Sequence, residues 1–106
     1  MPSTSLQHLT PKPACGTTRT LSGSVLVKTE GTSKRKARQA AEEQARRAAA
    51  SKLRSAWRTP CPKRCGPGVA DGDDEPNLVH LQTVKLAPKR WLSYYAGFWQ
   101  VEITCD

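Results

Sequence analysis

One uninterrupted run, residues 33–57, constrains the fold of this chain more than any other feature. The run contains neither glycine nor proline and is rich in Ala, Arg, Lys, Glu and Gln, which have the strongest helix propensities. Its apolar side chains recur three and four residues apart and so share one helix face: Ala37, Ala41, Ala45, Ala48, Ala49, Leu53, Ala56 and Trp57. The sequence therefore predicts a long amphipathic helix, with Thr32 or Ser33 as its N-cap.

Three segments around this helix have the pattern of β-strands. Residues 21–29 are one. In residues 78–86 the apolar side switches along the segment, which indicates a bulge or a strand covered on both faces. Residues 91–105 alternate apolar and polar from Gly97 onward and are long for one strand, so we expect either one bulged strand or a hairpin. The sequence thus predicts an α+β two-layer fold, β-α-β-β or β-α-β-β-β, with an antiparallel sheet and one long Ala-rich helix packed across it.

The length of 106 residues corresponds to a single domain. Residues 1–19, rich in Ser, Thr and Pro, are expected to form a flexible N-terminal arm, and residues 20–106 the α+β domain. Within the domain, residues 58–76 read as a long loop with cysteines, prolines and glycines followed by acidic residues. The chain has no apolar run of about 18 residues, so we expect no membrane span, and its first residues lack the apolar stretch of a signal peptide.

Four cysteines leave three chemical states open: Cys15, Cys61, Cys65 and Cys105. Two disulfides would staple a small core and would place the protein in an oxidising, exported location. Free thiols would place it in the cytoplasm. A tetrahedral zinc site would use the same residues, but such sites normally show two close pairs, and here only one pair is close in sequence. The sequence leaves all three disulfide pairings open, leaves the localisation unknown, and assigns no metal and no cofactor.

Positive charge is concentrated on the predicted helix and the loop after it. The formal net charge is +8, and eleven cations face only two acids between residues 34 and 64. Cations in the first turn of a helix interact unfavourably with the helix dipole. A cluster of cations at this position therefore suggests a functional role. Free N–H groups and cations together form a candidate anion or nucleic-acid site: Lys34, Arg35, Lys36 and Arg38. A solvated face with the ion pairs Glu42–Arg46 and Glu43–Arg47 is the alternative explanation of these charges.

The junction at residues 31–41 reads Gly-Thr-Ser-Lys-Arg-Lys-Ala-Arg-Gln-Ala-Ala and resembles the last strand-to-helix junction of double-stranded-RNA-binding domains. The likeness covers residues 25 to about 45. In that family, lysines at this helix start hold phosphates across a groove, so the resemblance implies a phosphate-binding role for the cations of the candidate anion site. The family also places a helix and two further strands before this junction, for which the preceding residues leave no room.

Aromatic residues cluster near the C-terminal end. Five of the six lie within nine residues: Trp91, Tyr94, Tyr95, Phe98 and Trp99. Because strand residues alternate between faces, these cannot all face the helix. Exposed aromatics beside cations can stack bases or bind a partner protein, so the candidate interaction surface is Lys89, Arg90, Trp91, Tyr94 and Tyr95. A sheet covered on both faces would instead bury the aromatics.

No catalytic signature stands out, and the two histidines, His8 and His80, have no nucleophile or carboxylate beside them in the sequence. We therefore expect a small non-catalytic binding module rather than an enzyme. Its basic helix face would contact an anionic partner, either nucleic acid or an acidic protein. The alternative is an exported or envelope domain, stapled by two disulfides, whose aromatic sheet surface is a protein interface. The sequence does not indicate the oligomeric state.

Overall fold

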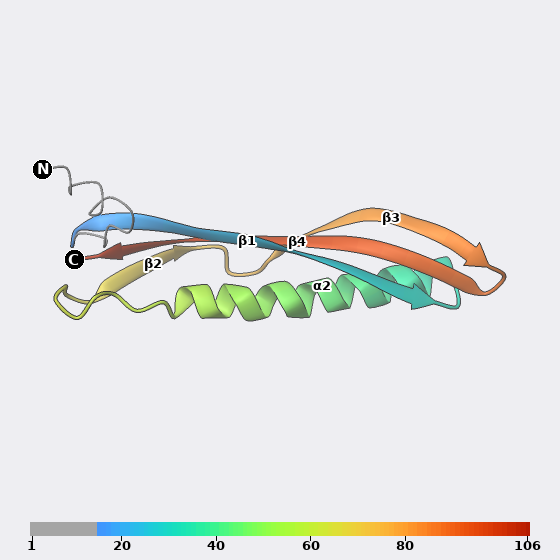
Figure 1. Cartoon of the computed structure of the whole chain (residues 1–106), viewed down its shortest axis with the longest axis horizontal. Helices are drawn as coiled ribbons and strands as arrows, with labels where there is room; N and C mark the ends of the chain where they lie inside the picture. Colours follow the sequence, from blue (N-terminus) through green and yellow to red (C-terminus); the bar gives the residue numbers. More distant parts are fainter. Residues whose placement is uncertain (1–14) are drawn as a thin grey trace, which may run out of the picture.

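The computed structural model describes residues 15–106 and shows one helix packed on a four-stranded antiparallel sheet (Figure 1). The elements follow the order β1 (Thr17–Gly31), α2 (Lys34–Trp57), β2 (Gly68–Gly72), β3 (Asn77–Ala87) and β4 (Arg90–Cys105). The expected α+β two-layer fold, with one long helix across an antiparallel sheet, is confirmed. Residues 1–14, which belong to the expected N-terminal arm, lie outside the described residues.

β4 is the strand around which the sheet is built. β1 pairs with β4 without a register shift, from Thr17 opposite Cys105 to Gly31 opposite Trp91. On the other side of β4, β2 and β3 pair one after the other with its C-terminal and N-terminal parts. The sixteen residues of β4 form one strand, so the expected hairpin is wrong. The expected bulge at Gly97 is wrong too, since Gly97 pairs in register with Val25 and Leu78.

The alanine face of α2 lies directly on the sheet. Four alanines spaced four residues apart are completely buried: Ala37, Ala41, Ala45 and Ala49. The helix begins as expected, because the Ser33 hydroxyl oxygen accepts a hydrogen bond from the Lys36 N–H at 3.1 Å. Only small side chains allow a helix to approach a sheet this closely. The buried alanines therefore favour the helix and also set its distance from β1 and β4.

A cluster of larger side chains fills the core toward the C-terminal end of α2. There Leu53 and Ala56 contact the helix-facing side chains Val101 and Ile103 of β4. Toward the middle of the helix the sheet contributes fewer atoms, since Gly97 lies beneath Ala49: a Cβ added at Gly97 would lie 3.0 Å from the Ala49 Cβ. The core is therefore one thin layer that widens toward the end where β4 terminates.

Two stretches differ from the sequence prediction. β1 begins at Thr17, so the strand includes the last residues of the expected arm. β2 lies inside the expected loop of residues 58–76. The sequence of β2, Gly-Val-Ala-Asp-Gly, has no strand pattern; it pairs because a disulfide between Cys61 and Cys105 holds this part of the loop against the end of β4.

The expected bulge in residues 78–86 is confirmed. The register between β3 and β4 shifts between His80 and Gln82 and again between Lys85 and Ala87. Each shift leaves one extra residue on β3, which moves the following side chains to the opposite face. This explains why the apolar side of the segment switches along the sequence.

Enlarging a buried alanine should weaken the fold. We expect Ala45→Leu to lower the free energy of unfolding by about 1–3 kcal/mol, because a close-packed helix–sheet contact must open to admit the larger side chain. Chemical denaturation followed by circular dichroism measures this change. Ala40→Leu, at an exposed position of the same helix, is the matched control and should change the value by less than about 0.5 kcal/mol. Equal effects of the two substitutions would contradict the role of the alanine face.

Candidate functional site

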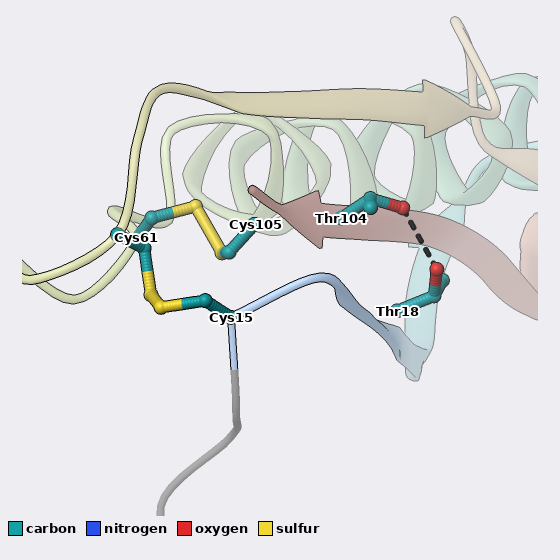
Figure 2. The surroundings of a disulfide bond; sticks show 6 residues. Cys15, Thr18, Cys61, Thr104 and Cys105 are labelled. Atoms are coloured by element: carbon teal, nitrogen blue, oxygen red, sulfur yellow. Dashed lines mark hydrogen bonds between the residues drawn. A yellow bond between two sulfur atoms is a disulfide. The ribbon is translucent and has the colours of Figure 1, made fainter.

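Two disulfide bonds close the end of the sheet where β4 terminates (Figure 2). Cys15 is bonded to Cys65 and Cys61 to Cys105, with Cα–Cα distances of 5.5 and 5.7 Å. Of the three pairings that the sequence left open, the structure therefore forms this one. Sulfurs joined in disulfides are not thiolate ligands, and residues 15–106 contain no cluster of His, Cys, Asp and Glu that could hold a metal ion.

Backbone and hydroxyl hydrogen bonds surround the disulfides. The Gly16 N–H donates to the Cys105 carbonyl oxygen, and the Gly66 N–H donates to the Asp106 carbonyl oxygen at 2.6 Å. The hydroxyl oxygens of Thr18 and Thr104 lie 2.8 Å apart between β1 and β4 (Figure 2). The segment before β1 and the loop after α2 are thus both tied to the last residues of β4.

Asp73, the first residue after β2, connects parts of the sheet and the helix. Asp73 bridges the gap between β2 and β3: its carboxylate accepts a hydrogen bond from the Gln100 N–H at 2.9 Å, and its own N–H donates to the Gln100 carbonyl oxygen at 2.9 Å. The Asp73 carbonyl oxygen accepts a hydrogen bond from the Trp57 indole N–H at 2.8 Å. Asp73 therefore connects the end of α2 to the free part of the β4 edge.

The four cations of the candidate anion site do not share one face. Lys34, Arg35 and Arg38 line an open hollow of about 430 Å³ together with Gln39, Glu42 and Tyr95. Lys36 does not line it, since residues two apart on a helix point in nearly opposite directions. The Lys36 N–H is already used by the N-cap and is not available to bind an anion.

The middle of α2 carries the ion pairs of a solvated face. The expected pairs Glu42–Arg46 and Glu43–Arg47 are present at 3.6 and 3.0 Å, and Arg46 also lies 3.1 Å from Glu43. Hydrogen bonds from Arg47 and then Arg46 hold the pKa of Glu43 below its ordinary value. In the described chain no ion pair involves the three cations that line the hollow. The positive charge at the start of the helix is therefore not compensated by ion pairs within residues 15–106.

The aromatic residues divide between the two faces of β4. Tyr95 faces the helix, is 4% exposed, and packs against Ala41 and Ala45. Its hydroxyl donates to a Glu42 carboxylate oxygen at 3.4 Å. The prediction that Tyr95 belongs to an exposed interaction surface is therefore wrong, because the helix covers this face of the strand.

The other members of that predicted surface lie near the β3–β4 turn. Lys89 occupies the turn with a left-handed φ of 61°. Arg90 forms an ion pair with Glu30 of β1 at 2.9 Å, and the Lys85 ammonium lies 5.9 Å from the centre of the half-buried Trp91 ring. Tyr94 lies on the face of β4 away from the helix and is half-buried. The five residues therefore do not form one surface.

An apolar patch that sequence reasoning did not assemble lies on the sheet face away from α2. In one row across three strands, Leu26 of β1 is opposite Ala96 of β4, and Ala96 is opposite Val79 of β3. Leu26 is 70% exposed, Phe98 45% and Val79 43%, whereas the small Ala96 between Leu26 and Val79 is buried. We call the following residues the outer-face patch: Leu26, Val79, Tyr94, Ala96 and Phe98. The sequence held a signal for Leu26, which lies between Val25 and Val27 and must face away from both.

A chain of hydrogen bonds links three side chains between β3 and β4. His80 Nε2 lies 2.6 Å from Thr83 Oγ1, which lies 2.8 Å from Ser93 Oγ. The His80 ring also packs against Tyr95, with ring centres 5.2 Å apart. Ser93 is completely buried. This chain of hydrogen bonds satisfies buried polar groups beside the β3 bulge. It could not be predicted from the sequence, because the bulge determines which residues of β3 and β4 are opposite each other.

The disulfide pairing gives a direct test of the closed end. We expect peptide mapping without reduction to yield only the Cys15–Cys65 and Cys61–Cys105 links. Replacing Cys61 and Cys105 together by serine should lower the free energy of unfolding by about 4 kcal/mol, the loop-closure value for a sequence separation of 44 residues. Denaturant titration measures the loss, and the doubly substituted Cys15→Ser/Cys65→Ser chain serves as the comparison. Another connectivity, or four reactive thiols, would contradict this end of the structure.

Comparison with known proteins found no family model, no curated protein and no solved structure that matches this chain. The element order also departs from that of double-stranded-RNA-binding domains, since one strand precedes α2 in the described residues and three strands follow it. No helix in the described residues is long and apolar enough to cross a bilayer. The evidence for function therefore comes from the two disulfides, the outer-face patch and the hollow lined by Lys34, Arg35 and Arg38.

Proposed function

We propose that this chain is a non-catalytic protein-interaction domain of an oxidising compartment, exported or in the cell envelope, and that the outer-face patch is its binding surface. The observation that carries the proposal is the exposure of apolar side chains on three adjacent strands, opposite the face that α2 covers. Contiguous exposed apolar and aromatic side chains mark protein interfaces more often than other sites.

The two disulfides support the compartment. Disulfide bonds persist in exported and envelope proteins and are rare where glutathione and thioredoxin keep thiols reduced. Both bonds close segments that have few apolar side chains of their own to bury. A fold that depends on such bonds is suited to an oxidising environment.

The charges of the outer face favour a protein partner over nucleic acid. On the outer face of β1, Lys28 is opposite Tyr94 and Glu30 is opposite Leu92, so opposite charges border the patch. A surface for nucleic acid would instead need an excess of cations beside its aromatics. The cations of α2 lie in the other layer (Figure 1). The outer-face patch therefore fits an apolar surface on another protein.

Site-specific photo-cross-linking tests the patch. A benzophenone amino acid in place of Phe98 should give one defined cross-linked product in the native host, identified by mass spectrometry. The matched control is the same amino acid in place of Glu102, which is exposed on the same face of the same strand beyond the patch. We expect no defined product from that position. Absence of a product from Phe98, or the same product from both positions, would overturn the proposed binding surface.

A second function, binding of an anionic partner by the start of α2, is favoured by one observation. Lys34, Arg35 and Arg38 line the same hollow and take no part in the ion pairs of the helix. An acidic protein segment or a nucleic-acid backbone would supply the missing negative charge. The carboxylate of Glu42 in the hollow limits the number of anionic groups that can enter.

Salt titration tests the second function. Binding to single-stranded RNA, double-stranded DNA and poly-glutamate should weaken with rising salt, and Lys34→Glu with Arg38→Glu should reduce the affinity by about tenfold or more, because phosphate and carboxylate contacts are lost. Fluorescence anisotropy measures the affinity. Lys52→Glu with Arg54→Glu makes the same change in net charge away from the hollow. Equal losses in the two variants would show nonspecific attraction, and no salt-dependent binding would exclude this function.

A further inference from the structure

β1 leaves one long edge of the sheet open. In residues 15–106 no strand pairs with the edge of β1 remote from β4. The strand is fifteen residues long, has no proline, and pairs with β4 without a register shift. Long regular edges are templates for another strand, and proteins normally block them with prolines, bulges or inward-pointing charges. β1 has no proline and no bulge, and its one charge on the helix-facing side, Arg19 opposite Ile103, lies near the end of the strand, so most of its backbone is available to pair.

We propose that β1 pairs antiparallel with β1 of a second copy of this chain, about a two-fold axis at Ser24. Ser24 is the midpoint of the strand Thr17–Gly31, so this register gives the longest overlap. An antiparallel pair of identical strands is self-complementary, since each residue pair occurs twice around the axis. The two sheets would join into one continuous sheet with both helices on the same side. The proposal concerns the sheet edge and does not depend on a partner at the outer-face patch.

The side chains of β1 fit this register. Each charged residue meets a threonine rather than a like charge, and an apolar pair meets on the helix side; the pairs across the axis are Lys28 with Thr20, Glu30 with Thr18, Arg19 with Thr29 and Val27 with Leu21. Like charges directly opposite each other destabilise a strand pair. A register centred on Lys28 would place two lysines together. The charge pattern therefore favours a second copy in the Ser24 register.

The helix layer is compatible with the same assembly. α2 lies over both β1 and β4, and neighbouring strands are about 4.8 Å apart. Across the two-fold axis the two helix axes would therefore lie about 10 Å apart, near the separation at which helices pack. Residues on the flank of each helix nearest β1 would face each other.

That helix flank is composed mainly of small uncharged residues. The Thr29 hydroxyl of β1 donates to the Gln44 side chain at 2.6 Å, and Ser55 lines a hollow with Thr20, Leu21 and Ser22. Ala48 and Ser51 lie between Gln44 and Ser55 at helical spacing. Lys52 lines the same hollow and is the charged residue of this flank; it is exposed, so its ammonium can extend into water. The opposite flank carries charged residues: Arg38, Glu42 and Arg46.

Sedimentation equilibrium of the full chain tests the proposal. We expect a concentration-dependent dimer, and Ser24→Lys should raise its dissociation constant by about tenfold, because two lysines then meet on the axis. Gln100→Lys adds the same charge at an exposed position of β4 and should leave the dimer unchanged. Mixing the Ser24→Lys chain with a Ser24→Glu chain should restore dimerisation as a heterodimer, which only a register centred on this residue predicts.

Three outcomes would overturn the proposal. A wild-type chain that stays monomeric at every concentration measured shows that the edge does not pair with itself, whatever the variants do. A dimer weakened equally by Ser24→Lys and Gln100→Lys shows that the added charge acts nonspecifically. A Ser24→Lys dimer as tight as that of the wild type, with unchanged circular dichroism, places the contact elsewhere. If Ser24→Lys does not fold, Ser24→Glu alone must weaken the dimer, because it also brings like charges together.

Discussion

The close contact between the alanine face of α2 and β4 is the constraint on which the rest of the structure depends. Completely buried alanines contribute little apolar area each, so the contact gives proximity rather than a thick core. This contact is favourable because the residues of α2 have high helix propensity and because Gly97 has no side chain to hold the helix away from the sheet. A helix with larger side chains at these positions would lie further from the sheet and would change how much of β1 and β4 is covered.

A thin core explains why the disulfides lie where they do. Domains of this size bury a limited fraction of their surface and are often stapled by covalent bonds. β2 has five residues and could not hold the loop after α2 in place by its own pairing. The Cys61–Cys105 bond holds β2 against the end of β4, and the Cys15–Cys65 bond ties in the start of β1. The bonds therefore act where side-chain packing is weakest.

Sequence patterns predicted the elements whose stability is local or periodic. The helix, its Ser33 cap, the ion pairs of its middle and the alternation in β4 all follow from spacing along the chain. β2 could not be predicted, because its pairing depends on a disulfide between distant residues. The error at Tyr95 has the same origin: alternation places Tyr94 and Tyr95 on opposite faces, but only the tertiary position of α2 decides which face is covered.

The position of one helix also decides which surfaces remain for function. Because α2 covers one face of a sheet that is only three strands wide at any level, residues 15–106 leave the opposite face and the edge of β1 to solvent or to partners (Figure 1). The basic residues of α2 could be recognised in the sequence, because a cluster of charges is apparent without knowledge of the fold. Leu26 and Val79 are ordinary apolar residues until the register places them in one row across the strands. A charged site can thus be seen in the sequence, whereas an apolar interface becomes visible only when strand register and helix position are both known.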